Sequence, residues 1–275
     1  MSHLRRTFLV VLSLLLASPA GAVEPGSPLS IQPSPRPRPV APPPATRPID
    51  LSRFLESPGR EESAIRLWLR YNREAHGIEQ GVRDFLDTLG RLAAQMPKEA
   101  IFPHEHVRLD AELIAADQEL MALEEARKLM LAELGRSDPD NAILEGELPP
   151  PWSPDGTLER ESLVGLAFAR SGKAGPLEPA VERLLARIVS VDRRLASMEV
   201  QLLPAAEEAL GSSLIALSSG EASLLEVLNG LRFLSQQQRA HLELRTQREL
   251  LLLELAHQLG CSVEQLPWSS SSPQG

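Results

Sequence analysis

Two long stretches of the sequence repeat apolar residues at alternating intervals of three and four, and no other feature restricts the fold as strongly. The first runs from Leu109 to Leu134 and has one charged member, Arg127. The second runs from Val181 to Leu202. This spacing places apolar side chains on one face of a helix and is typical of a coiled-coil seam. The sequence therefore predicts long helices that pack side by side.

The composition favours the same architecture. The chain has 275 residues, of which 43 % are apolar and only 4 % aromatic, and Leu and Ala dominate the apolar set. Such a bias suits helices better than a sheet. We therefore expect an all-α fold of two long antiparallel helical hairpins with coiled-coil packing. The expected divisions are a signal peptide (1–22), a Pro-rich disordered tether (23–59), a first helical hairpin (60–136), a connector with a short helix (137–176), a second helical hairpin (177–260) and a disordered tail (261–275).

The N-terminal segment has the pattern of a secretory signal peptide. Arg5 and Arg6 precede an apolar run of about ten residues, which is too short to span a bilayer as a helix. Small residues at Ala20 and Ala22 then suit cleavage. We expect an exported protein of the periplasm or the outer membrane. Residues 23–48 contain ten prolines and are predicted to form an extended tether.

Charge and cysteine content exclude other classes. The formal net charge is −9 and no block of Lys or Arg stands out, so nucleic-acid binding is not expected. Cys261 is the only cysteine, and an internal disulfide is therefore impossible. A secreted chain of this size then has to rely on packing or oligomerisation.

Two short motifs bear on chemistry. The Ser-Gly-Lys sequence at 171–173 resembles part of a phosphate-binding loop, but Ala167 and Ala174 stand where that loop needs Gly and Ser or Thr. His104, Glu105 and His106 could ligate a metal; a solvated turn is the favoured interpretation because no distant third ligand is evident. Since no nucleophile–base set or carboxylate pair can be named either, we expect no enzyme activity, cofactor or metal.

Two features of the second half leave alternatives open. Pro204 either kinks one long helix or starts a new one. The middle of the last helix carries Gln238, His241 and Arg245, which indicates a solvated face or a water-filled lumen in place of a dry core.

The stretch SSGEASLLEVLNGLRFLSQQ at 218–237 joins two helical patterns. Gly220 can adopt a left-handed conformation and end the incoming helix. Ser219 or Ser223 can cap the outgoing helix, whose positive N-terminal turn suits Glu221 or Glu226. Local capping chemistry therefore predicts a helical turn here.

The region 202–260 around this turn resembles the last periplasmic hairpin of the TolC outer-membrane efflux family. The matching positions are Pro204, Ala206, Gly220, Ser223, Val227, Leu228, Leu259 and Gly260. Glu226 replaces the usual Asp, and Asn229-Gly230 replaces Asp-Ala. Weaker similarity extends the resemblance to about 75–260, but the sequence shows no pair of the alternating strands that the family's barrel needs.

The resemblance implies a structural role in a tripartite efflux or secretion system. In that family, helices of a homotrimer wall a periplasmic tunnel, and the hairpin tips dock a periplasmic adaptor (membrane fusion) protein that connects to an inner-membrane pump. By resemblance, the partner-binding tip comprises Gly220, Glu221, Ser223, Glu226, Val227 and Leu228. The alternative is a non-transporting periplasmic helical scaffold or interaction protein derived from that family.

Overall fold

Long helices lying side by side form most of the molecule. The computed structural model describes residues 61–96, 102–133, 156–171 and 177–270. Its long elements are α3 (Glu61–Gln95), α4 (Pro103–Glu133), α7 (Pro179–Ser197), the π-helical turn η1 (Met198–Leu202), α8 (Leu203–Ser219) and α9 (Leu224–Gln258). The short elements are α6 (Arg160–Ser171), the 3-10 turn η2 (Val263–Gln265) and the strands β1 (Gly156–Leu158) and β2 (Trp268–Ser270). The all-α prediction is confirmed for this part of the chain, whereas the segments predicted to be a signal peptide and a Pro-rich tether lie outside the described residues.

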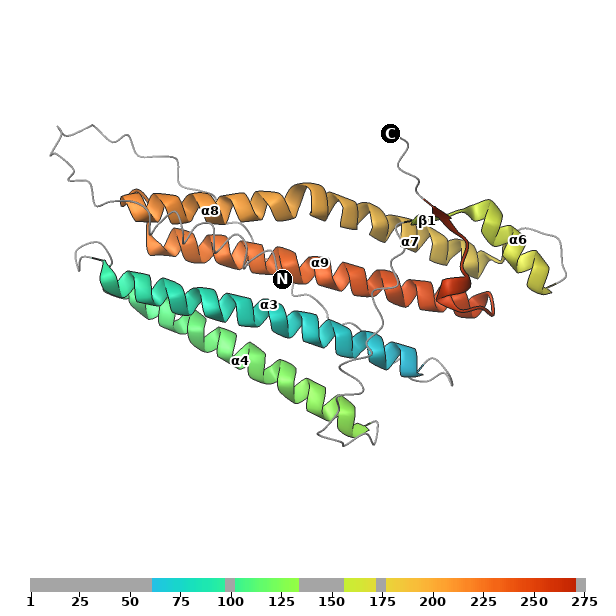
Figure 1. Cartoon of the computed structure of the whole chain (residues 1–275), viewed down its shortest axis with the longest axis horizontal. Coiled ribbons are helices and arrows are strands. Elements are labelled where there is room, and N and C mark those ends of the chain that lie inside the picture. The colour runs from blue at the N-terminus through green and yellow to red at the C-terminus, as the bar shows by residue number, and fades with distance from the viewer. Residues whose placement is uncertain (1–60, 97–101, 134–155, 172–176, 271–275) are drawn as a thin grey trace.

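The helices form a layer with two edges. Figure 1 shows α7 and α8 along one edge, α9 and α3 in the middle, and α4 along the other edge. Close approaches between α3 and α4 pair Gly90 with Leu109, and Arg83 with Asp117. Residue numbers therefore fall along α3 as they rise along α4, so these two helices run in opposite directions.

The core is divided along the length of the layer. One buried cluster joins α3, α4, α8 and α9 near the α8–α9 turn, and includes Leu86, Leu214 and Leu228. A second cluster lies at the other end, where Leu163 of α6 packs with residues of α7 and α9. Apolar burial at each end holds the long helices together.

Helix α7 continues through η1 into α8 without a break. Leu202 and Leu203 both keep right-handed helical dihedral angles, and the N–H of Leu203 donates to the carbonyl of Met198, five residues back. This wider turn comes immediately before Pro204, which has no N–H to donate and would clash in a regular helix. Of the two alternatives at Pro204, the structure therefore has one continuous helix with a local distortion.

The distortion also changes which residues face the core. Val181, Ile188 and Met198 are buried as the apolar repeat predicts, but Leu202 is 41 % exposed. The extra residue per turn in η1 rotates the later positions relative to the earlier ones. The prediction that Leu202 continues the buried row is therefore wrong.

Part of the expected disordered tail is folded. Val263 and Leu266 are buried against the cluster formed by α6, α7 and α9. The Trp268 indole N–H donates to the carbonyl of Val263 at 3.3 Å, and β2 pairs antiparallel with β1 through Leu158 and Trp268. Apolar burial and strand pairing therefore hold this part of residues 261–270, whereas 271–275 lie outside the described part.

Candidate functional site

The turn between α8 and α9 has the geometry that its sequence predicts. Gly220 adopts φ 78° and ψ 12°, in the left-handed region that other residues enter only with strain. The N–H groups of Gly220 and Glu221 donate to the carbonyls of Leu217 and Ala216 at 3.1 and 2.8 Å. These two bonds form a Schellman motif, which ends α8 and satisfies its last carbonyl groups.

Ser223 begins the outgoing helix. Its backbone is extended, and its hydroxyl oxygen accepts a hydrogen bond from the N–H of Glu226 at 3.3 Å. Ser219 has a different role, because its hydroxyl donates to the carbonyl of Ala216 at 3.0 Å. Ser223 is therefore the N-cap, and Ser219 supports the end of the preceding helix.

The six residues predicted to bind a partner fall into two groups. Gly220, Glu221, Ser223 and Glu226 are exposed. Val227 and Leu228 are 0 % and 2 % exposed, because they share a helix face with Leu224 and pack into the core. In this structure the first four can contact a partner directly, whereas Val227 and Leu228 hold the turn in place.

The start of α4 forms a second exposed feature. The Phe102 ring is 63 % exposed and stacks on His104, with the ring centroids 5.6 Å apart. Glu105 is only 2 % exposed, and its carboxylate accepts a hydrogen bond from the N–H of Phe102 at 2.9 Å. Glu105 thus caps the helix from its third position, as in a capping box.

The side chains of His104, Glu105 and His106 therefore do not converge on one point. Both histidines are exposed, whereas Glu105 is buried and engaged with the backbone. Among the described residues, no group of three or more His, Cys, Asp or Glu side chains is arranged to hold a metal.

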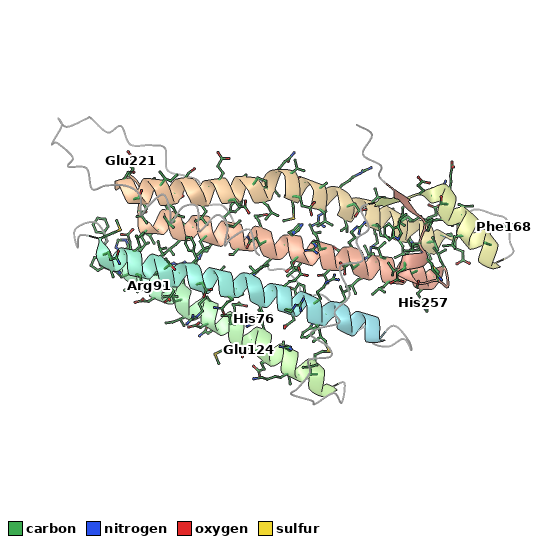
Figure 2. All side chains as sticks on the ribbon, in the orientation of Figure 1. His76, Arg91, Glu124, Phe168, Glu221 and His257 are labelled. Atoms are coloured by element: carbon green, nitrogen blue, oxygen red, sulfur yellow. The ribbon has the colours of Figure 1, made fainter. Side chains whose placement is uncertain are left out.

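Both features lie at the same end of the molecule, which we call the tip (the α8–α9 turn at 219–223 and the start of α4 at 102–106). The end of α3 and the start of α9 belong to one buried cluster, in which Ala93 and Leu224 take part. Figure 2 shows Glu221 and Arg91 at this end, and His257 and Phe168 at the opposite end.

Farther from the tip than the buried cluster of α3, α4, α8 and α9, pairs of oppositely charged side chains join the helices. We call the five ion pairs named in this paragraph the charged layer. Arg70 of α3 binds Glu249 of α9, and both side chains are buried. Arg245 of α9 lies 3.3 Å from Glu74 of α3, and Arg248 lies 2.5 Å from Asp192 of α7. The remaining pairs are Arg239 with Glu79 at 2.6 Å and His241 with Glu199 at 2.8 Å.

Burial makes two of these carboxylates unusual. Desolvation raises the pKa of Glu249, although Arg70 opposes the shift. Desolvation also raises the pKa of Glu79, against the opposing effect of Arg239. In each case the arginine favours the ionised form of the carboxylate, against the effect of burial.

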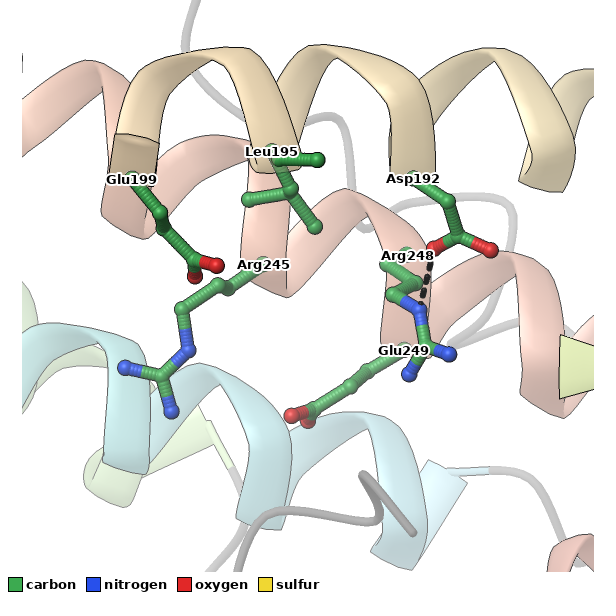
Figure 3. A pocket seen from close by; sticks show the side chains of 7 residues that line it. Asp192, Leu195, Glu199, Arg245, Arg248 and Glu249 are labelled. Atoms are coloured by element: carbon green, nitrogen blue, oxygen red, sulfur yellow. Dashed lines mark hydrogen bonds and ion pairs between the residues drawn. The ribbon is translucent and has the colours of Figure 1, made fainter. Parts of the chain in front are cut away.

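A cavity of about 220 Å³ opens within the charged layer between α7, η1 and α9. Figure 3 shows charged side chains on both of its sides, with Arg248 bonded to Asp192. The other charged residues of its lining are also engaged, Arg245 with Glu74, Glu249 with Arg70 and Glu199 with His241. Each charged residue that lines the cavity therefore has an oppositely charged partner, and these ion pairs hold the helices in register.

The charged layer adds ion pairs to the polar face that the sequence predicts for the middle of α9. The side chains of His241 and Arg245 are 19 % and 32 % exposed, and both also pair with acidic residues of neighbouring helices. The sequence places Arg70 and Glu74 on the same face of α3. Their pairing with charged residues of α9 can be recognised only once it is known that α3 packs against α9.

The described helices contain no apolar stretch of the length needed to cross a membrane. Comparisons with protein-family models, curated proteins and solved structures find no match to this chain.

Proposed function

We propose that this chain is an exported, TolC-like component of an efflux or secretion assembly, in which the tip docks a periplasmic adaptor protein. The observation that carries the proposal is the position of the two exposed features, both at one end of long helices. Glu221 and Ser223 are exposed in the α8–α9 turn, Glu226 is exposed in the first turn of α9, and Phe102 is exposed immediately before α4. A partner built of helices can engage such an end without any conformational change of the core.

The rest of the molecule suits a structural role. Helices α3 and α9 each have 35 residues, which corresponds to a length of roughly 50 Å at 1.5 Å per residue. Their antiparallel, coiled-coil-like hairpins would form part of a periplasmic tunnel wall in a homotrimer. The inner-membrane pump would contact the assembly through the adaptor. No bond chemistry takes part in this mechanism.

One observation favours the alternative, a non-transporting periplasmic helical scaffold of the same ancestry. Helices α3, α4, α8 and α9 bury a common core within a single chain, in which Leu224 and Val227 are fully enclosed. A chain that completes its own core does not need further copies to fold. The two functions differ in oligomeric state and in membrane association.

Membrane fractionation combined with mass measurement in detergent separates the two functions. A trimer that co-purifies with a pump adaptor is the result expected for the tunnel component. A soluble monomer would contradict the tunnel and favour the scaffold. If the tip docks the adaptor, replacing Gly220 by Val should weaken adaptor binding, because a β-branched residue is strained at the left-handed φ of this turn.

A further inference from the structure

Helix α7 exposes a group of arginines, which we call the α7 basic patch (residues 183, 187, 193 and 194). Arg183, Arg187 and Arg194 follow one another at intervals of four and seven residues, so they form a single row along the helix. The row is roughly 16 Å long. Ser190 and Ser197 lie in the same row and are exposed as well.

The charges of the α7 basic patch are not neutralised within the described chain. No acidic residue lies three or four positions before or after any of the four arginines, and no ion pair joins them to a described carboxylate. The two acidic residues of α7, Glu182 and Asp192, pair instead with Arg160 of α6 and Arg248 of α9. Exposed arginines of α3 and α4 differ in this respect, because each has a carboxylate partner (residues 83, 91 and 108).

The patch makes the two halves of one edge of the layer opposite in charge. The arginines occupy α7, whereas η1 and α8 carry Glu199, Glu207 and Glu208 and no basic residue. The basic half lies beside α6, and the acidic half ends at the tip. Since the whole chain has a formal net charge of −9, an anionic partner meets attraction at the basic half and repulsion at the acidic half.

The composition of the row indicates a partner that bears phosphate groups. A guanidinium group can form two parallel hydrogen bonds with phosphate oxygens, and the serine hydroxyls of the row can donate further ones. A partner helix is less well suited, because helices that associate in water need an apolar seam. Helix α7 has one large exposed apolar side chain, Val189, and the row itself has none.

An exposed aromatic ring at the same end favours a lipid surface over a soluble phosphate compound. Phe168 of α6 is 49 % exposed, and Figure 2 shows it at the end opposite the tip. Helix α6 is held beside the start of α7 by the fully buried Leu163 and by the ion pair of Arg160 with Glu182. An aromatic side chain beside a basic face is typical of surfaces that bind at the headgroup level of a membrane.

We propose that the α7 basic patch binds the phosphate headgroups of an anionic lipid surface, with α6 toward the lipid and the tip away from it. The contact is peripheral and electrostatic. Repulsion of the acidic α8 edge by the same surface keeps the tip away from the lipid. The inference goes beyond the proposed function, because the tip takes no part in it.

Cosedimentation of the full chain with lipid vesicles tests the proposal. The protein should bind vesicles that contain phosphatidylglycerol better than vesicles of phosphatidylcholine alone, and the difference should disappear at high salt. In Arg183→Ser/Arg187→Ser/Arg194→Ser, binding should weaken roughly fivefold for each arginine removed. Helicity should not change, since all three positions are exposed. The corresponding triple Lys variant keeps the charge and should retain most of the binding.

A second triple variant controls for net charge. Arg83→Ser/Arg91→Ser/Arg108→Ser removes the same number of positive charges from exposed positions of α3 and α4, and it should bind vesicles like wild type. Residues 1–60 are identical in both triple variants, so any contribution from them cancels in the comparison. Equal loss in the two triples, or equal binding to the two kinds of vesicle, would overturn the proposal.

Two further measurements distinguish lipid from other anionic partners. If inorganic phosphate displaced the protein more strongly than chloride at equal ionic strength, the patch would be a site for free phosphate compounds. If the chain bound poly-glutamate but not the vesicles, the partner would be an acidic protein, and either result would overturn the lipid assignment. Gly220→Val should bind vesicles like wild type, so failure of the tip and failure of the lipid contact are observed separately.

Discussion

Two regions hold the same helices together by different physical means: the buried cluster of α3, α4, α8 and α9 near the tip, which we call the tip half, and the charged layer. In the tip half, Leu86, Leu224 and Leu228 pack without charge, so the interaction is non-directional. In the charged layer, Arg70 and Glu249 meet inside the protein, so each fixes the other's position. The comparison indicates that apolar packing provides cohesion, whereas the buried pairs determine how α3 and α9 align.

Removing one charge of the layer should have the largest effect. Arg70→Ala leaves Glu249 buried without its main cation, and such a loss typically costs about 3–5 kcal/mol of unfolding free energy. Urea unfolding at pH 7 measures it. Arg91→Ala is the control, since Arg91 pairs with Asp87 on the surface, and we expect a loss of no more than about 0.5 kcal/mol there.

The loss of stability caused by Arg70→Ala should become smaller as the pH falls. Burial raises the pKa of Glu249 and Arg70 lowers it, so in Arg70→Ala the folded-state pKa rises further. A carboxyl with a raised folded-state pKa destabilises the fold when ionised, and the penalty disappears as the pH falls through that pKa. The stability gap between Arg70→Ala and wild type should therefore narrow from pH 7 toward pH 5, and a constant gap would contradict the ionised pair.

Truncation in the tip half should cost slightly less and should not depend on pH. Leu228→Ala removes a side chain that is 2 % exposed, and a cavity of this kind costs about 3 kcal/mol. Unfolding measured at pH 5 and pH 7 should give the same loss at both values. If the loss of unfolding free energy in Leu228→Ala changed with pH, the packing of the tip half would be coupled to the ionised pairs of the charged layer.

The helix cap at the tip should have the smallest effect. Glu105→Ala removes the acceptor of the Phe102 N–H, which we expect to cost about 1 kcal/mol. His106→Ala, at an exposed neighbouring position, should leave the melting temperature unchanged. A chelator should change neither variant; chelator sensitivity that depends on His106 would instead indicate a metal site.

Much of the tip was predictable from the sequence because its determinants are local. The left-handed turn at Gly220 and the cap at Ser223 depend on residues within a few positions, and both predictions are confirmed. The capping role of Glu105 was not predicted, although Glu105 lies only three residues from Phe102 in the sequence. The two flanking histidines give the same segment the pattern of a possible metal site.

The charged layer could not be predicted in the same way because its partners lie far apart in the sequence. Arg70 and Glu249 are 179 positions apart, so their pairing depends on how α3 aligns with α9. The exposed position of Leu202 likewise depends on the wide turn before Pro204, which shifts an otherwise regular repeat. Periodicity predicts faces of single helices and leaves their mutual alignment open.

Adaptor binding by two matched glycine variants tests the role of the tip most directly. Gly220 and Gly260 both have left-handed backbones, with φ 78° and 64°, but they lie at opposite ends of α9. Replacing either by Val should cost a similar 1–2 kcal/mol, roughly the strain of a left-handed residue. With a purified periplasmic adaptor, we predict that Gly220→Val loses affinity on the order of tenfold, about 1.4 kcal/mol, while Gly260→Val binds like wild type. Equal binding by both variants would contradict the assignment of the tip as the docking surface.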